Sequence, residues 1–207
     1  MLRFLVAGSG GILARPHGRG HPQGPAMLGR TMNEPNPTAA HDASAPVASP
    51  ATPQAHPRYY WEDFRVGSSR EFGAMPVTRE AVLAFARDFD PQPFHLDDEA
   101  ASRSLFGKLA ASGWHTCAMA MRIMCDDYLL RSASLGSPGI DNLRWLAPVF
   151  PGDTLRMRFE VLAARPMASR PGVGLVQSRW HLINQHDQPV LSMEGWGMFR
   201  MRPAPDA

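Results

Sequence analysis

Residues 112–131 read SGWHTCAMAMRIMCDDYLLR, and this stretch decides the fold. Its apolar residues recur at the three- and four-residue spacing of an α-helix and cover most faces of that helix. One stripe consists of Trp114, Cys117, Ala118, Met121, Cys125 and Tyr128, widened by Ala120, Ile123 and Met124. A helix that is apolar on most faces is buried and does not lie on a surface. The sequence therefore predicts one long buried helix.

Two shorter helices are predicted before it. The stretch VTREAVLAFARDFD, residues 77–90, carries apolar residues on one helical face, and Thr78 stands at the capping position. This helix must end near Asp90, because the residue before a proline is pushed out of the helical region. The stretch DDEAASRSLFG, residues 97–107, is acidic in its first turn and ends at Gly107.

After Gly139 the pattern changes to the two-residue period of β-strands. Four strands are predicted, with the sequences NLRWLAPV (142–149), TLRMRFEVLA (154–163), GVGLVQSRWHLIN (172–184) and PVLSMEGWGMFRMR (189–202). The turns between them are short, which makes neighbouring strands antiparallel. One long buried helix and an antiparallel sheet form an α+β domain, in which we expect the sheet to curl around the helix.

The composition changes near residue 57. Residues 1–57 contain nine prolines, seven glycines and four arginines but only two acidic residues. This segment has too little apolar periodicity to offset the entropy of ordering it, so we predict that it is disordered. A secretory signal, an organelle transit peptide and translation from an upstream start remain alternatives for its first residues. The folded domain is predicted to span residues 58–207.

Charge and hydropathy restrict the partners of that domain. From Arg58 onward there are 17 basic and 17 acidic residues, so the domain is neutral and lacks the basic surface of a nucleic-acid-binding protein. No apolar run reaches the roughly 18 residues that a membrane span needs. Cys117 and Cys125 would lie about 12 Å apart on one helix, too far for a disulfide. We therefore expect buried thiols in a reducing compartment, the cytoplasm.

Two side chains that can exchange protons flank a rigid segment. Asp90 and His95 are separated by Pro91-Gln92-Pro93-Phe94. A straight polyproline segment would hold the two side chains roughly 15 Å apart, so we expect a bend around Gln92 to Phe94. The prolines would then limit the other conformations. Asp88 and Asp97 compete with Asp90 for the acidic role, and Asp97 is predicted to cap the next helix instead.

The start of the long helix is suited to bind an anion. Ser112 is the predicted cap, and Gly113 leaves its backbone N–H open to close approach. Alternatively, Gly113 only permits tight packing of the helix on the sheet. His115, one turn later, is predicted to be a hydrogen-bonded core histidine. His181 and His186 would face opposite sides of a strand, so no metal site is predicted.

Four stretches resemble, in order, the MaoC-like acyl dehydratases, a family that includes the (R)-specific enoyl-CoA hydratases. They are YYWEDFRVG (59–67), FDPQPFHLDDEAA (89–101), FGKLAASGWHT (106–116) and RWLAPVFPGDTL (144–155). The most diagnostic family segment runs Asp, any residue, Asn, Pro, an aliphatic residue and His. Here Gln92 and Phe94 depart from it, while the Asp-to-His spacing and the second proline agree. The resemblance extends over about residues 59–203.

The resemblance implies a hot-dog fold and a hydro-lyase that adds or removes water across the 2,3 bond of an enoyl thioester. It implies that Asp90 and His95 transfer the protons. It also implies that the Gly113 amide, next to Ser112, receives the charge of the thioester oxygen. The acyl group would be carried on CoA or on acyl carrier protein, without a metal or redox cofactor. A homodimer is expected, with the acyl pocket at or near its interface.

Two rival functions remain. A thioesterase on the same fold would hydrolyse the thioester, although the Asp90-to-His95 segment favours hydration. A non-catalytic acyl-thioester-binding protein would have no need to retain both side chains. Phe94, Phe106 and Trp114 either line an acyl tunnel or belong to an aromatic core.

Overall fold

The computed structural model describes residues 57–204. The predicted disordered segment falls almost wholly outside these residues, and both the disorder and the domain boundary near residue 57 stay predictions. No helix in the described part of the chain is long and apolar enough to cross a membrane. The cytoplasmic location also stays a prediction.

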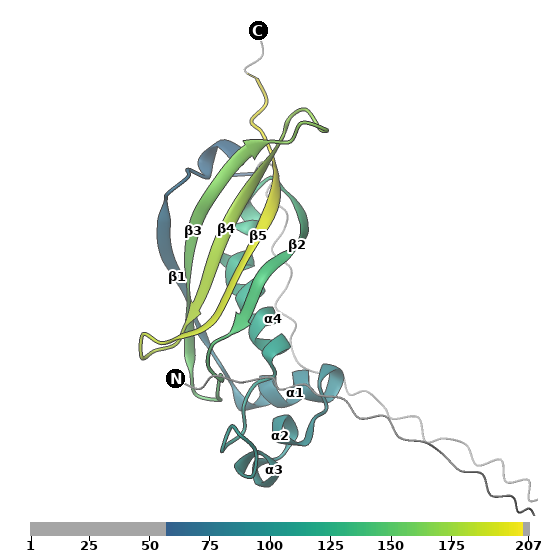
Figure 1. Ribbon diagram of the computed structural model, residues 1–207, viewed down its shortest axis with the longest axis vertical. Coiled ribbons are helices and arrows are strands. Elements are labelled where there is room, and N and C mark those ends of the chain that lie inside the picture. Colours follow the sequence, from purple (N-terminus) through teal and green to yellow (C-terminus); the bar gives the residue numbers. More distant parts are fainter. Residues whose placement is uncertain (1–56, 205–207) are drawn as a thin grey trace, which may run out of the picture. The chain divides into compact units, whose positions relative to one another are not determined.

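The long predicted helix is α4 (Gly113–Asp127), which runs behind the strands in Figure 1. Ser112 caps it, because its side-chain oxygen accepts a hydrogen bond from the N–H of Trp114 at 3.2 Å. The helix ends at Tyr128, and a short 3-10 helix, η2 (Leu129–Arg131), follows. Both the helix and its cap are confirmed.

The sheet has five strands, one more than predicted. Its members are β1 (Ser69–Pro76), β2 (Ser134–Trp145), β3 (Thr154–Pro166), β4 (Val173–Ile183) and β5 (Pro189–Arg200). Their order is β1-β3-β4-β5-β2, and every neighbouring pair is antiparallel. The α+β class is therefore confirmed.

The two edges of the sheet are β1, which was not predicted, and β2, which was predicted with the wrong start. β1 is almost entirely exposed and has a bulge between Phe72 and Met75, so no two-residue period marks it. β2 begins at Ser134, eight residues before the predicted start, in the stretch SLGSPG, whose composition is that of a turn. An edge strand tolerates glycine and proline there, because one side of its backbone needs no partner.

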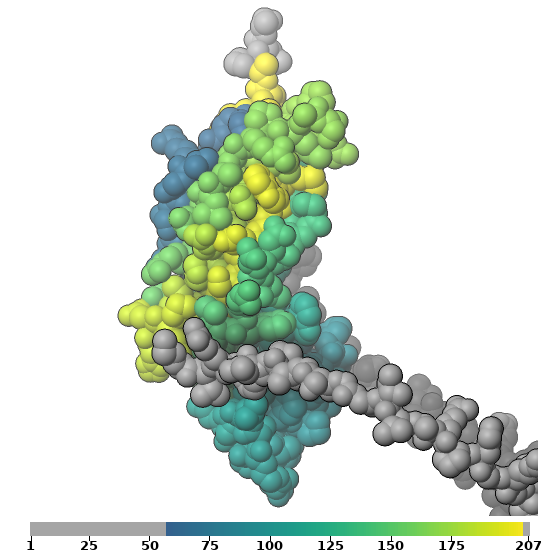
Figure 2. Space-filling view, in the orientation of Figure 1, coloured from purple at the N-terminus to yellow at the C-terminus, as the bar shows by residue number. Residues whose placement is uncertain are grey.

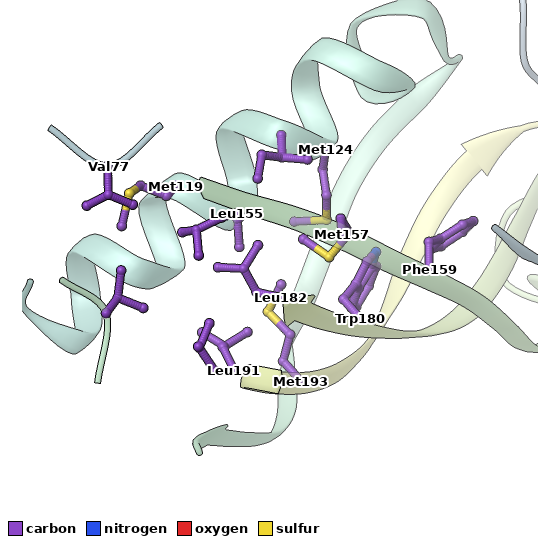
Figure 3. Close-up of a cluster of buried hydrophobic side chains, with 14 of the residues drawn as sticks. Val77, Met119, Met124, Leu155, Met157, Phe159, Trp180, Leu182, Leu191 and Met193 are labelled. Carbon is purple, nitrogen blue, oxygen red and sulfur yellow. The ribbon is translucent and has the colours of Figure 1, made fainter. Parts of the chain in front are cut away.

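The central strands place alternate side chains against α4. Leu155, Met157 and Phe159 of β3 are buried on the side that faces the helix, together with Leu182 of β4. Figure 3 shows these side chains opposite Met119 and other residues of α4. Each fully buried apolar side chain stabilises the fold by about 1.5–3 kcal/mol, so this contact fixes the helix on the sheet.

The other face of α4 is exposed, which corrects the prediction of a helix buried on most faces. Trp114 and Met121, which belong to the predicted buried stripe, are 60% and 47% exposed. Cys117 and Cys125 are free thiols and only half-buried. The sheet covers one side of the helix, where Met119 and Ile123 lie. Composition alone does not distinguish a helix covered on all sides from one covered on a single side.

Three short helices lie at the N-terminal end of α4, in the lobe below the sheet in Figures 1 and 2. They are α1 (Arg79–Phe89), α2 (Pro93–Leu96) and α3 (Asp98–Ser102), and a 3-10 helix, η1 (Trp61–Asp63), precedes β1. Thr78 caps α1, as predicted, by accepting from the N–H of Ala81 at 3.2 Å. The predicted helix over 97–107 is shorter and ends at Ser102.

A substitution at Gly73, in the β1 bulge, would test how closely β1 packs against α4. Gly73 has φ +83°, and a Cβ there would lie 2.7 Å from the side chain of Ile123. Gly67 has a similar φ of +81° with nothing within 4 Å of its Cβ position. We expect Gly73→Ala to lower the free energy of unfolding by about 1–3 kcal/mol more than Gly67→Ala, measured by urea denaturation. Equal losses of unfolding free energy in the two variants would mean that the Ile123 side chain can move aside without destabilising the fold.

Candidate active site

Asp90 stands where α1 ends and the chain turns. Pro91 prevents the helix from continuing, and Asp90 has left the helical region with φ −149° and ψ 67°. The N–H of Gln92 donates to the carbonyl of Asp90 at 2.7 Å, and Pro93 then begins α2. The bend expected around Gln92 to Phe94 is this turn and the first residues of α2.

His95, in α2, is buried and held in one orientation. Its Nδ1 lies 2.8 Å from the carbonyl oxygen of Ala110. A carbonyl can only accept, so Nδ1 carries the proton of this hydrogen bond. In the neutral ring the open nitrogen is then Nε2, which lies 3.6 Å from Oδ2 of Asp90. The two side chains therefore face each other at a distance slightly longer than a direct hydrogen bond.

Ser112 connects the cap of α4 to Asp90. Its hydroxyl donates to Oδ2 of Asp90 at 2.6 Å, across 22 residues of sequence. The same oxygen accepts from the N–H of Trp114, and the residue is only 1% exposed. One buried hydroxyl thus fixes the start of the helix relative to the carboxylate.

The surroundings of Asp90 favour its ionised form. The hydroxyl of Ser112 is the main cause that holds the pKa of Asp90 below its ordinary value, and partial burial opposes it. The side-chain amide of Gln92 also lowers this pKa by donating to Oδ1 at 2.7 Å, and His95 adds a smaller attraction. Gln92, a departure from the family segment, therefore contacts the carboxylate directly.

Gly113 is the first residue of α4, so its N–H has no intrahelical acceptor. It also has no other acceptor among residues 57–204. The indole of Trp145 lies against this glycine, and its Nε1 donates to the Gly113 carbonyl at 2.8 Å. Gly113 lines the same pocket as Asp90.

Asp90, His95 and Gly113 line one pocket of about 490 Å³. Most of its remaining wall is apolar. Phe94, Phe106, Trp114, Trp145 and residues 146–149 contribute to it. The three aromatic residues left open by the sequence therefore lie at the pocket, although their contact with an acyl chain stays a prediction.

The competing residues lie elsewhere. Asp88 is exposed on α1. Asp97 caps α3, as predicted, by accepting from the N–H of Ala100 at 2.8 Å. His115 is buried and stacked on Phe85, with ring centroids 4.7 Å apart, and burial lowers its pKa. The hydrogen bond expected for a core histidine is missing at Nδ1, which has no partner in the described part of the chain.

Two hydrogen-bonding groups of this site were not predicted from the sequence. The carbonyl of Ala110 fixes the ring of His95, and Trp145 fixes Gly113. No residue-type signal marks a backbone carbonyl. Trp145 is 32 residues from Gly113, and only the fold brings it there.

Removing the Ser112 hydroxyl should raise the pKa of Asp90. A depressed pKa in the folded state means that Asp90 stabilises the fold above its unfolded-state pKa. That stability is lost as the pH falls through the folded-state value. Ser112→Ala should therefore raise the titration midpoint of the Asp90 carboxyl in ¹³C NMR and reduce this pH-dependent stability. Ser104→Ala is the control, because the Ser104 hydroxyl bonds to the carbonyl of Ala101 and to the N–H of Phe106 but not to Asp90. An unchanged midpoint in Ser112→Ala would contradict this account.

Residues 63–177, more than half of the 207-residue chain, match the family described as the MaoC like domain. A crystal structure of the MaoC-like dehydratase from Rhodospirillum rubrum is 41% identical, with a TM-score of 0.65. It covers 70% of this chain and 99% of its own chain.

Two further similarities are more limited. Mesaconyl-CoA hydratase from Cereibacter sphaeroides is 44% identical over 66 residues, which span 30% of this chain and only 19% of the hydratase. A Mycobacterium tuberculosis protein with a double hot-dog fold is 19% identical, with a TM-score of 0.61. It covers 72% of this chain and 46% of its own chain, and this likeness concerns the fold alone. The chain belongs to the MaoC-like domain family and has the hot-dog fold.

Proposed function

We propose that this protein adds water across the 2,3 double bond of an enoyl thioester, or removes it from the corresponding 3-hydroxyacyl thioester. The observation that carries the proposal is the 3.6 Å approach of Asp90 Oδ2 to His95 Nε2 at one pocket. Gly113, whose N–H is the proposed oxyanion donor, lines that same pocket. A base, an acid and an oxyanion donor are the groups that the reaction requires.

Asp90 and His95 exchange the protons as a pair. The attacking water loses one proton to the pair, its oxygen bonds to C3, and the pair returns one proton to C2. Nε2 is the nitrogen of His95 that takes part, because Nδ1–H is bonded to Ala110. A water bound between Nε2 and the Asp90 carboxylate would satisfy both groups. Ser112 and Gln92 keep that carboxylate ionised, so it orients the water and stabilises a protonated imidazole.

The Gly113 N–H binds the thioester oxygen. As the water adds, negative charge develops on that oxygen. A fixed N–H at a helix start meets this charge without reorganisation. One such donor is typically worth about 2.7–4 kcal/mol of transition-state stabilisation.

The acyl carrier in this proposal is CoA or acyl carrier protein. The name of the Cereibacter sphaeroides relative, a mesaconyl-CoA hydratase, supports a CoA thioester. We propose no metal or redox cofactor, since water addition to a conjugated thioester changes no overall oxidation state and the chain's own groups supply the proton transfers.

The first test follows the enoyl-thioester absorbance of crotonyl-CoA with the full 207-residue chain. We expect the absorbance to fall without release of free thiol. Asp90→Asn keeps the shape but removes the charge, and His95→Gln removes the imidazole, so each should lower kcat at least about 100-fold. Asp88→Asn, on the exposed side of α1, should retain wild-type activity. Thiol release would instead identify a thioesterase, and a bound but unreacted thioester would identify a binding protein.

We also propose that the protein is a homodimer, paired through an α4–β2 apolar face made of Trp114, Met121, Ile140 and Trp145. All four side chains are at least 46% exposed. Trp114 and Trp145 contact each other edge to face, and Met121 and Ile140 line a common apolar cavity of about 200 Å³. Exposed apolar residues gathered on a helix and an edge strand are typical of an interaction surface.

Placing a charge on this face should separate the subunits. Met121→Glu would bury an unpaired carboxylate in the interface, so we expect a monomer in sedimentation equilibrium where the wild type is a dimer. Val66→Glu is the control, because Val66 is 61% exposed and lies before β1, outside the α4–β2 apolar face. A monomeric wild type, or dissociation of both variants, would contradict the proposed interface.

A further inference from the structure

Trp145 contacts the residue to which the proposed function assigns the thioester oxygen. It is the last residue of β2, and its indole Nε1 donates to the carbonyl of Gly113 at 2.8 Å. The indole also lines the pocket that holds Asp90 and His95. The mechanism proposed above uses the N–H of Gly113 but gives Trp145 no role.

The glycine and the indole fit each other closely. A Cβ at position 113 would lie 2.7 Å from Cε2 and 2.8 Å from Nε1 of Trp145, closer than real Cβ contacts. Gly113 does not have a positive φ, so its backbone conformation alone does not require a glycine. The indole therefore occupies the space that any side chain at this position would need.

The indole is carried by a hydrogen-bonded part of the sheet. Trp145 pairs with Leu191 of β5, and the next residue, Leu146, donates its N–H to Val190 at 2.9 Å. On its other side the ring meets Trp114 edge to face, with centroids 5.5 Å apart and planes at 82°. A group anchored in this way can hold a neighbour in place more precisely than a loop residue.

The start of α4 needs such support. The first residues of a helix lack intrahelical bonds for their N–H groups and are prone to fray. Ser112 anchors this turn from the side of Asp90, and Trp145 anchors it through the Gly113 carbonyl. The N–H of Gly113 belongs to the Ser112–Gly113 peptide, so one contact lies just before this peptide and the other just after it. A displacement of about 1 Å at a catalytic group can lower a rate 100-fold.

We propose that Trp145 is a positioning residue, which fixes the Gly113 amide in the direction from which it binds the thioester oxygen. This inference rests on the proposed hydration reaction. Trp145 itself is not a catalytic residue, because it acts through Gly113.

The chain contains a matched control for this role. Trp61 also donates its indole N–H to a backbone carbonyl, that of Leu175, at 3.2 Å. It too fills the space beside a glycine, since a Cβ at Gly174 would overlap its ring. This second pair joins η1 to the start of β4, away from helices α1–α3 (Figure 1), and neither Trp61 nor Gly174 lines the pocket around Asp90. Trp61→Phe thus removes the same kind of bond without touching the site.

The experiment compares Trp145→Phe and Trp61→Phe in the full chain, using crotonyl-CoA hydration. Phenylalanine keeps an aromatic ring but removes the donor. We expect Trp145→Phe to lower kcat about tenfold and to change KM by less than about threefold, because a misplaced oxyanion donor weakens binding of the transition state more than binding of the substrate. Trp61→Phe should leave both constants unchanged. Trp145→Phe should also keep the sedimentation behaviour of the wild type.

A second measurement does not depend on activity. The N–H of Thr116 donates to the carbonyl of Ser112 at 3.0 Å, so its hydrogen exchange reports opening of the first turn of α4. We expect faster exchange at Thr116 in Trp145→Phe and unchanged exchange in Trp61→Phe.

The outcomes separate the two proposals. Unchanged kcat in Trp145→Phe, a loss confined to KM, or an equal loss in Trp61→Phe would overturn the role of Trp145. If the wild type hydrates no thioester, the proposed function fails, and the exchange at Thr116 alone decides whether Trp145 positions the start of α4. Unchanged exchange in Trp145→Phe would then overturn the positioning role as well.

Discussion

The hydrogen bond from the Ser112 hydroxyl to Asp90 joins the two parts of the domain on which the candidate site depends. One part is the long helix, fixed to the sheet by its buried side. The other is the lobe of short helices that carries Asp90 and His95. Because the same oxygen also caps α4, the position of the helix start and the charge state of the carboxylate are set by one buried group. This bond therefore helps to fix how the two walls of the pocket lie relative to each other.

Helix α4 serves two surfaces at once. Met119 and Ile123 hold it against the sheet, while Trp114 and Met121 are exposed on the opposite side. The five-stranded sheet covers one side of the helix and leaves the other side exposed. The first turn of α4 is held from two directions, because Ser112 donates to Asp90 of the lobe and the Gly113 carbonyl accepts from Trp145 of β2.

The sequence predicted those features that depend on local physics. The period of α4, the caps Thr78, Ser112 and Asp97, and the end of α1 before Pro91 follow from residue type and spacing. Strand β1 was missed because an exposed, bulged edge strand has no periodicity to detect. The exposed stripe of α4 was misassigned because its residues have the composition of a core. The contact of Trp145 with Gly113 joins positions far apart in the chain, and no local rule could predict it.

The burial of His95 bears on the net charge of the site during the proposed reaction. The ring is only 4% exposed, and one of its nitrogens is committed to the Ala110 carbonyl. Its other nitrogen faces Asp90 and the pocket. In the proposed reaction this pair takes one proton from the attacking water and returns one proton to the substrate. The site then ends each turnover with the net charge with which it began, and one cycle leaves it ready for the next.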